Sequence, residues 1–133
     1  PQSWSVISQF AQGERAETAM NSVYELLNTP YGAKIFDPPY KKHYFEDALM
    51  KVYNLDVKEN GGIFSQTQGW LILAEALLGH GNRAFQYFME SAPIAMNDKA
   101  EVRVCEPYVH SQFTEYLFHT VSSIFTNYAF RLR

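Results

Sequence analysis

The feature that most constrains the fold is a pattern that occurs twice in the chain. The run Gln2-Ser3-Trp4 is matched by Gln68-Gly69-Trp70, and Gly13-Glu14-Arg15-Ala16 is matched by Gly81-Asn82-Arg83-Ala84. Each copy has the pattern of an apolar helix, a glycine turn, a second helix and a loop that contains proline. Two αα-hairpins in series predict an array of helical hairpins. The alternative is a coincidence between two ordinary helix pairs.

Apolar residues recur at the spacing of a helix face over most of the sequence. The predicted helices cover residues 4–11, 14–27, 67–78 and 83–89, and a last amphipathic helix runs over 113–128. Between them lie a weaker helical pattern around Phe45, Leu49 and Val52 and a strand-like run, Val102-Arg103-Val104. The expected fold is therefore all-α, built from αα-hairpins that are joined by long irregular loops.

Composition narrows the class of protein. The chain has 133 residues, 47% of them hydrophobic and 16% aromatic, which is enough for one domain with its own core. A formal charge of −3 without a long basic run argues against a nucleic-acid-binding protein. No apolar run approaches the roughly 20 residues of a membrane span. The single Cys105 and the lack of a visible signal peptide lead us to expect a cytoplasmic protein.

A polar loop before two glycines is the first candidate site. The run Val57-Lys58-Glu59-Asn60-Gly61-Gly62 combines an ammonium, a carboxylate and an amide at a place where the backbone can approach a ligand closely. Sugars bind to such dense polar groups beside aromatic rings, and Tyr53, Phe64 and Trp70 are near in sequence. The bare pattern alone favours the alternative, a charged turn exposed to solvent.

A second polar run covers residues 103–112 and ends where the last predicted helix begins. His110 is a candidate general base within it, although a structural histidine is the commoner interpretation. The scattered histidines predict no metal site. Cys105 has no local context that would activate a nucleophile, so we expect a buried, inert thiol.

Two long runs and several turns match a known family. The long runs are Lys58-Glu59-Asn60-Gly61-Gly62-Ile63-Phe64 with Gln68-Gly69-Trp70, and Glu106-Pro107-Tyr108-Val109-His110-x-Gln112-Phe113. The shorter ones are Pro1-Gln2-Ser3-Trp4, Thr29-Pro30-Tyr31-Gly32, Asp37-Pro38-Pro39 and Ala74-Glu75-Ala76-Leu77-Leu78-Gly79. In these residues the chain resembles the inverting disaccharide phosphorylases of glycoside hydrolase family 94, which includes cellobiose and chitobiose phosphorylases.

The resemblance implies a fold and a division of the chain. The family's catalytic domain is an (α/α)6 barrel, or toroid, which agrees with the hairpin repeat. Residues 1–133 are then a single partial barrel domain, in which 1–115 follow the family and 116–133 form a divergent C-terminal helix.

The resemblance also implies a reaction and binding residues. Such enzymes cleave a β-linked disaccharide with inorganic phosphate and invert the anomeric carbon; phosphate replaces the water of an inverting hydrolase, and one carboxylic acid protonates the leaving oxygen. By motif match, Glu59 hydrogen-bonds sugar hydroxyl groups, Lys58 and Tyr53 line the acceptor subsite, and Gln112 orients sugar or phosphate. The family implies no metal and no organic cofactor.

Three departures from the family weaken the expectation of activity. The family's general-acid Asp precedes the Pro-Gln-Ser-Trp motif, so in this numbering it falls before Pro1. The family's phosphate-contacting His corresponds to Gln66, a degenerate phosphate-binding residue that donates a hydrogen bond but has no positive charge. The Thr-Gly phosphate loop expected after Gln112 is missing. We therefore expect no catalytic residue here and a truncated phosphorylase relative that is inactive alone.

Two other interpretations stay open, so the chain is not assigned as an enzyme at this point. It is either a piece of an active phosphorylase, or a non-catalytic helical protein that binds carbohydrate or associates with itself. An open arc of hairpins leaves apolar helix faces uncovered, and these faces predict a homo-oligomer.

Overall fold

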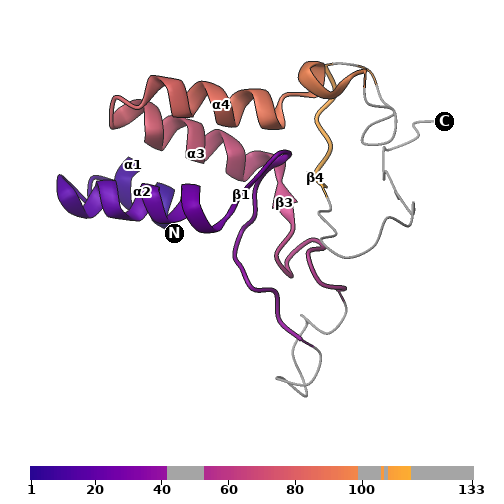
Figure 1. Ribbon diagram of the computed structural model, residues 1–133, viewed down its shortest axis with the longest axis horizontal. Helices are drawn as coiled ribbons and strands as arrows, with labels where there is room; N and C mark the ends of the chain where they lie inside the picture. The colour runs from indigo at the N-terminus through magenta and orange to yellow at the C-terminus, as the bar shows by residue number, and fades with distance from the viewer. Residues whose placement is uncertain (42–52, 99–105, 107, 115–133) are drawn as a thin grey trace.

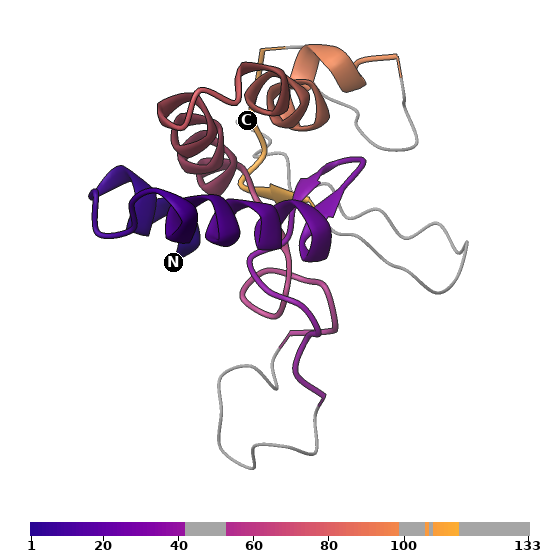
Figure 2. The ribbon, with the colours of Figure 1, turned by 60° about the vertical axis from the view of Figure 1, so that its left-hand side comes forward.

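Helices dominate the computed structural model, which describes residues 1–41, 53–98, 106 and 108–114. In this described part, α1 (Gln2–Ile7) and α2 (Glu14–Leu26) form one αα-hairpin, and α3 (Ser65–Leu77) and α4 (Gly81–Ser91) form a second. A 3-10 helix, η2 (Pro93–Met96), follows α4. Figures 1 and 2 show the two hairpins next to each other, with a long loop region below them. Both predicted hairpins are thus present.

The two copies of the sequence repeat lie against each other. The Trp4 and Trp70 rings meet edge to face with their centroids 5.5 Å apart. Between α2 and α4, the Tyr24 hydroxyl donates to Gln86 Oε1 at 3.2 Å, and Arg83 Nη1 donates to Asn21 Oδ1 at 2.8 Å. Such stacking of one hairpin on the next is compatible with a fragment of an α/α barrel.

Short strands correct the all-α expectation. Strands β1 (Asn28–Thr29) and β2 (Gly32–Ala33) form an antiparallel pair, as do β3 (Ile63–Phe64) and β4 (Phe113–Thr114). The helix predicted over 113–128 is therefore wrong at its start, because Phe113 and Thr114 pair with a strand some 50 positions away that local periodicity does not reveal. Residues 115–128, the weak pattern at 45–52 and the run 102–104 lie outside the described residues.

The core between the hairpins is small and mostly aliphatic. Its buried members are Val6, Ala11, Ala16, Met20, Val23, Ala33, Leu71, Ala74 and Tyr87. Several residues of the predicted apolar faces are exposed instead, among them Phe10 and Leu26. Helix α1 ends at Ile7, and Gln9 has a φ of 61°, so the helical spacing no longer applies at Phe10. Leu26 is the last residue of α2, where the chain turns into β1.

A buried glutamine joins the start of α3 to β2. The Gln68 amide accepts a hydrogen bond from Ala33 N at 2.8 Å and donates to Ala33 O and Phe64 O, each at 2.9 Å. A side chain on Gly32 would come within 3.0 Å of Gln68 Oε1, and the Gly32 φ of 113° also favours glycine. This pairing anchors β2 and β3 on the second hairpin.

A buried carboxylate holds the turn between α3 and α4. Glu75 is fully buried, and its carboxylate lies 2.7 Å from His80 Nδ1 and 3.4 Å from Arg83 Nη1. His80 Nε2 in turn lies 3.2 Å from the carboxylate of Glu17 on α2. The network therefore links both hairpins through polar contacts.

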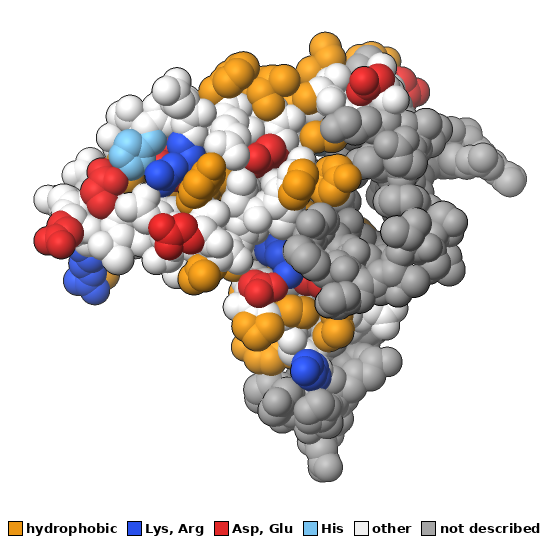
Figure 3. Space-filling model, viewed as in Figure 1, with side chains coloured by type: hydrophobic (Ala, Val, Ile, Leu, Met, Phe, Trp, Pro, Cys, Tyr) orange, Lys and Arg blue, Asp and Glu red, His pale blue; other side chains and the backbone are white. Residues whose placement is uncertain are grey.

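One surface of the second hairpin is apolar. Phe85, Phe88 and Met89 on α4 are 63%, 46% and 41% exposed. Figure 3 shows hydrophobic side chains gathered along the upper edge of the molecule, over α4. None of the described helices is long and apolar enough to cross a membrane.

Candidate functional site

The candidate loop, residues 53–62, is organised around the side chain of Asn60. Asn60 is 1% exposed, and its amide makes a two-way pair with the backbone of Tyr40: Oδ1 accepts from Tyr40 N at 2.8 Å and Nδ2 donates to Tyr40 O at 3.0 Å. The same Nδ2 lies 3.4 Å from Tyr53 O. One buried amide thus satisfies backbone groups of two chain segments and fixes them side by side.

The backbone of this loop is tightly wound. Asp56 N donates to Asn60 O at 2.9 Å, and Gly62 N donates to Lys58 O at 2.8 Å. Asp56 and Lys58 have φ values of 62° and 45°, which residues other than glycine rarely adopt. A Cβ on Gly62 would lie 2.6 Å from Lys58 N, so only glycine fits there. The Gly-Gly pair of the sequence therefore marks a place where two parts of the backbone approach each other closely.

A buried lysine forms ion pairs with two aspartates, one of which belongs to the loop. Lys34 Nζ forms ion pairs with Asp37 and with Asp56 Oδ1, the latter at 2.7 Å, and both Lys34 and Asp56 are buried. Burial alone would lower the pKa of Lys34, but the hydrogen bonds and charges of the two aspartates outweigh it, and the pKa is raised. These ion pairs therefore link the loop, through Asp56, to the segment that contains Lys34 and Asp37.

Two aromatic rings lie close to the Lys58 ammonium. Lys58 Nζ lies 5.6 Å from the ring centroid of Tyr53 and 5.5 Å from that of Phe113. Phe113 in turn contacts Phe64 across the β3–β4 pair, with centroids 6.0 Å apart. The first polar run and the end of the second are therefore neighbours in the fold.

The structure brings most of the predicted binding residues to one region. Tyr53 and Lys58 are in contact, and Gln112 O accepts a hydrogen bond at 3.0 Å from Ser65 N, the residue before Gln66. Glu59 follows Lys58 and is exposed, as are the Gln66 and Gln112 side chains. His110 is also exposed, whereas Cys105 lies outside the described residues.

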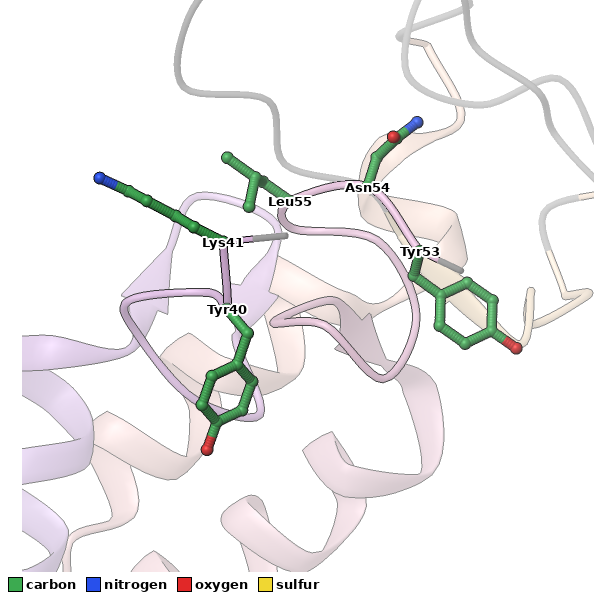
Figure 4. Close-up of a pocket in the computed structure, with 5 residues that line it drawn as sticks. All are labelled: Tyr40, Lys41, Tyr53, Asn54 and Leu55. Carbon is green, nitrogen blue, oxygen red and sulfur yellow. The ribbon is translucent and has the colours of Figure 1, made fainter. Parts of the chain in front are cut away.

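A pocket of about 220 Å³ adjoins the loop (Figure 4). Its lining residues are Tyr40, Lys41, Tyr53, Asn54 and Leu55. The rings of Tyr40 and Tyr53 point to different sides in this view, so they do not form one stacking platform. The other predicted binding residues do not line this pocket: the side chains of Glu59, Gln66 and Gln112 are exposed elsewhere, and Lys58 is half-buried.

Sequence reasoning missed two residues that shape the region. The polar run predicts that Asn60 offers its amide to a ligand, whereas the amide is buried and holds the backbone. Its position before two glycines was the available signal. The helical pattern places Phe113 on a helix, and nothing in the local sequence indicates that it meets Lys58.

Matches to known proteins cover most of the residues described above. The family model described as "Glycosyl hydrolase 94 superfamily, catalytic domain" matches residues 1–117. The chain is 38% identical over 109 residues to N,N'-diacetylchitobiose phosphorylase of Vibrio furnissii, covering 82% of this chain and 14% of that protein. It is 30% identical over 107 residues to solabiose phosphorylase of Paenibacillus borealis, covering 80% and 14%. The chain therefore spans about a seventh of the length of these relatives.

Proposed function

The chain belongs to the glycosyl hydrolase 94 superfamily, and on that premise we propose that it carries part of the saccharide-binding surface of a disaccharide phosphorylase. The observation that supports this proposal is the locked loop 53–62, which holds Lys58 and Glu59 at its tip next to the β3–β4 pair. The relatives named above are phosphorylases of diacetylchitobiose and solabiose. A β-linked disaccharide is accordingly the ligand class we propose.

The proposed roles are binding roles. The exposed carboxylate of Glu59 accepts hydrogen bonds from sugar hydroxyl groups, while the Lys58 ammonium and the Tyr53 ring line the acceptor side. The exposed amides of Gln66 and Gln112 donate to sugar or phosphate oxygens without adding charge. Each of these roles binds or orients a ligand, and none of them transfers a proton.

We therefore propose that this chain binds a disaccharide without turning it over. Phosphorolysis would need inorganic phosphate as the nucleophile and a carboxylic acid that protonates the leaving oxygen. Mixed with phosphate and diacetylchitobiose, the purified chain should release no sugar 1-phosphate. Release that depends on protein concentration and is abolished in Glu59→Ala would show a complete active site instead.

Calorimetric titration tests the binding itself. Diacetylchitobiose at millimolar concentration should give a saturable heat with the wild-type chain, and Glu59→Gln should weaken the affinity about fivefold or more, since it removes a charged acceptor. Glu25→Gln is the matched control, because Glu25 is an exposed residue of α2. A flat wild-type titration, or equal loss in both variants, would contradict the proposal.

A second candidate function is self-association. The observation that favours it is the exposed apolar row Phe85, Phe88 and Met89 on α4. These three positions, i, i+3 and i+4, share one face of α4, and large exposed apolar patches mark interaction sites. The occupant we propose is a second copy of this chain.

A further inference from the structure

The Lys58 ammonium lies close to two rings that come from distant parts of the sequence. Its Nζ is 5.6 Å from the centroid of Tyr53, five positions earlier, and 5.5 Å from that of Phe113, on strand β4. Both distances fall within the range of about 6 Å in which the face of an aromatic ring attracts a cation. Lys58 is half-buried, so solvent screens this attraction only partly.

The pairing of β3 with β4 determines where the second ring lies. Phe64 and Phe113 are register partners in this antiparallel pair, and their rings are in contact at 6.0 Å. Ser65 donates backbone and side-chain hydrogen bonds to the residues just before Phe113, through Gln112 O and Ser111 O. The Phe113 ring is therefore held by the strand pair and by Phe64, and it also contacts Lys58.

The backbone conformation at Lys58 fixes the start of its side chain, so the ring contacts can determine where the ammonium points. The φ of 45° and the hydrogen bond from Gly62 N to Lys58 O fix where its side chain leaves the loop. Among the described residues, no carboxylate forms an ion pair with Lys58. The two rings thus orient the ammonium without neutralising it, and its three N–H donors stay available to a ligand.

We infer that Phe113 is a positioning residue: together with Tyr53 it forms an aromatic clamp that aims the Lys58 ammonium at the bound saccharide. The second half of the inference rests on the proposed function, in which Lys58 donates to sugar oxygens. The clamp itself does not depend on it. Strand β4 consequently belongs to the binding region through the ring of Phe113.

Lysine NMR tests the clamp without any ligand. Reductive dimethylation with a ¹³C label keeps the charge of each lysine and gives one methyl signal per site, and Lys58→Arg identifies the signal of Lys58. Ring currents should move that signal upfield of the other lysines. Phe113→Leu should remove much of the displacement, while Phe113→Tyr, which keeps the ring, should preserve it.

Circular dichroism of each variant separates loss of the clamp from loss of the fold. If Phe113→Leu does not fold, Tyr53→Leu provides the same measurement from the other ring. A Lys58 signal that coincides with those of the other lysines, or that is equally displaced in folded Phe113→Leu and wild type, overturns the inference.

A double-mutant cycle then tests the link to the ligand, with diacetylchitobiose as the probe. Phe113→Leu should weaken binding about fivefold, and Lys58→Met at least as much. The double variant should bind no more weakly than Lys58→Met alone, because Phe113 acts through Lys58. Independent, multiplicative losses overturn the positioning role. If the wild-type chain binds no saccharide, the proposed function fails, and the NMR result still decides the clamp.

Discussion

At the residue scale, the most consequential groups are buried polar side chains. Four of them are buried, and each has partners that match its chemistry: Lys34, Glu75, Asn60 and Gln68. Lysine and glutamate are seldom buried unless they are paired. Their burial could not be read from the sequence, because the partners lie on other elements or at irregular spacing.

Tyr87 gives a prediction about alkaline pH. Its side chain is fully buried, and its hydroxyl has no hydrogen-bond partner among the described residues. Burial, assisted by the Glu75 carboxylate, raises the pKa of Tyr87. The native state then keeps this proton above pH 10, while the unfolded state releases it, so the free energy of unfolding must fall as the pH rises from there.

The variant Tyr87→Phe isolates this contribution. At pH 7 it should not lower the free energy of unfolding, since it removes a buried hydroxyl without a partner. Between pH 10 and 12 its stability should decline less steeply than that of the wild type, by up to about 1.4 kcal/mol per pH unit. Urea unfolding followed by circular dichroism measures both. Tyr108→Phe is the control, because that ring is 78% exposed; identical slopes in all three proteins would contradict the assignment.

The raised pKa of Lys34 acts in the same direction and explains why Tyr87→Phe should not abolish the alkaline slope. Its stabilising contribution is fully present below the unfolded value near 10.5 and is lost as the pH rises through the folded value. The ion pairs with Asp37 and Asp56 therefore support the candidate loop throughout the neutral range.

At the element scale, loop 53–62 depends on one glycine. Gly62→Ala would place a Cβ 2.6 Å from Lys58 N and 2.7 Å from Lys58 O, so the backbone beneath Lys58 and Glu59 must shift. We expect a loss of about 1–3 kcal/mol in the free energy of unfolding and weaker saccharide binding. Denaturant unfolding and calorimetry measure the two effects.

Gly69→Ala is the matched control for this substitution. Gly69 lies within α3, and a Cβ there meets nothing within 4 Å. Alanine should therefore stabilise the helix by about 0.5–1 kcal/mol. Equal changes in the free energy of unfolding of the two variants would show that the close approach at Gly62 does not constrain the loop.

The elements also show what the sequence could predict. Helices α2, α3 and α4 agree with the predicted segments because each buries one face against a neighbour, which local periodicity records. The contact of Trp4 with Trp70 agrees with the repeat. Strand β4 and the clamp around Lys58 were not predictable, since they depend on a pairing of two residues with two others far along the chain. The loop as a candidate site came from its residue types; that Asn60 locks it became visible only in the fold.

At the scale of the whole molecule, the apolar row on α4 needs an explanation. Phe85 and Phe88 stack with their centroids 6.5 Å apart and are both more than two-fifths exposed. On the other side of the same helix, Gln86 and Arg83 make polar contacts with α2. The helix therefore has one satisfied face toward the first hairpin and one uncovered apolar face.

If a second copy of the chain covers this face, removing its apolar side chains should weaken dimerisation. Burying a large apolar side chain contributes about 1.5–3 kcal/mol, so the double variant Phe85→Ser, Phe88→Ser should weaken dimerisation roughly 100-fold or more. In sedimentation equilibrium at tens of micromolar, the wild type should have a mass near twice 15.3 kDa and the double variant the single mass. Phe10→Ser, which changes a 75% exposed ring on the first hairpin, should still dimerise. A monomeric wild type at every concentration would rule out the second copy and leave saccharide binding by a monomer as the remaining proposal.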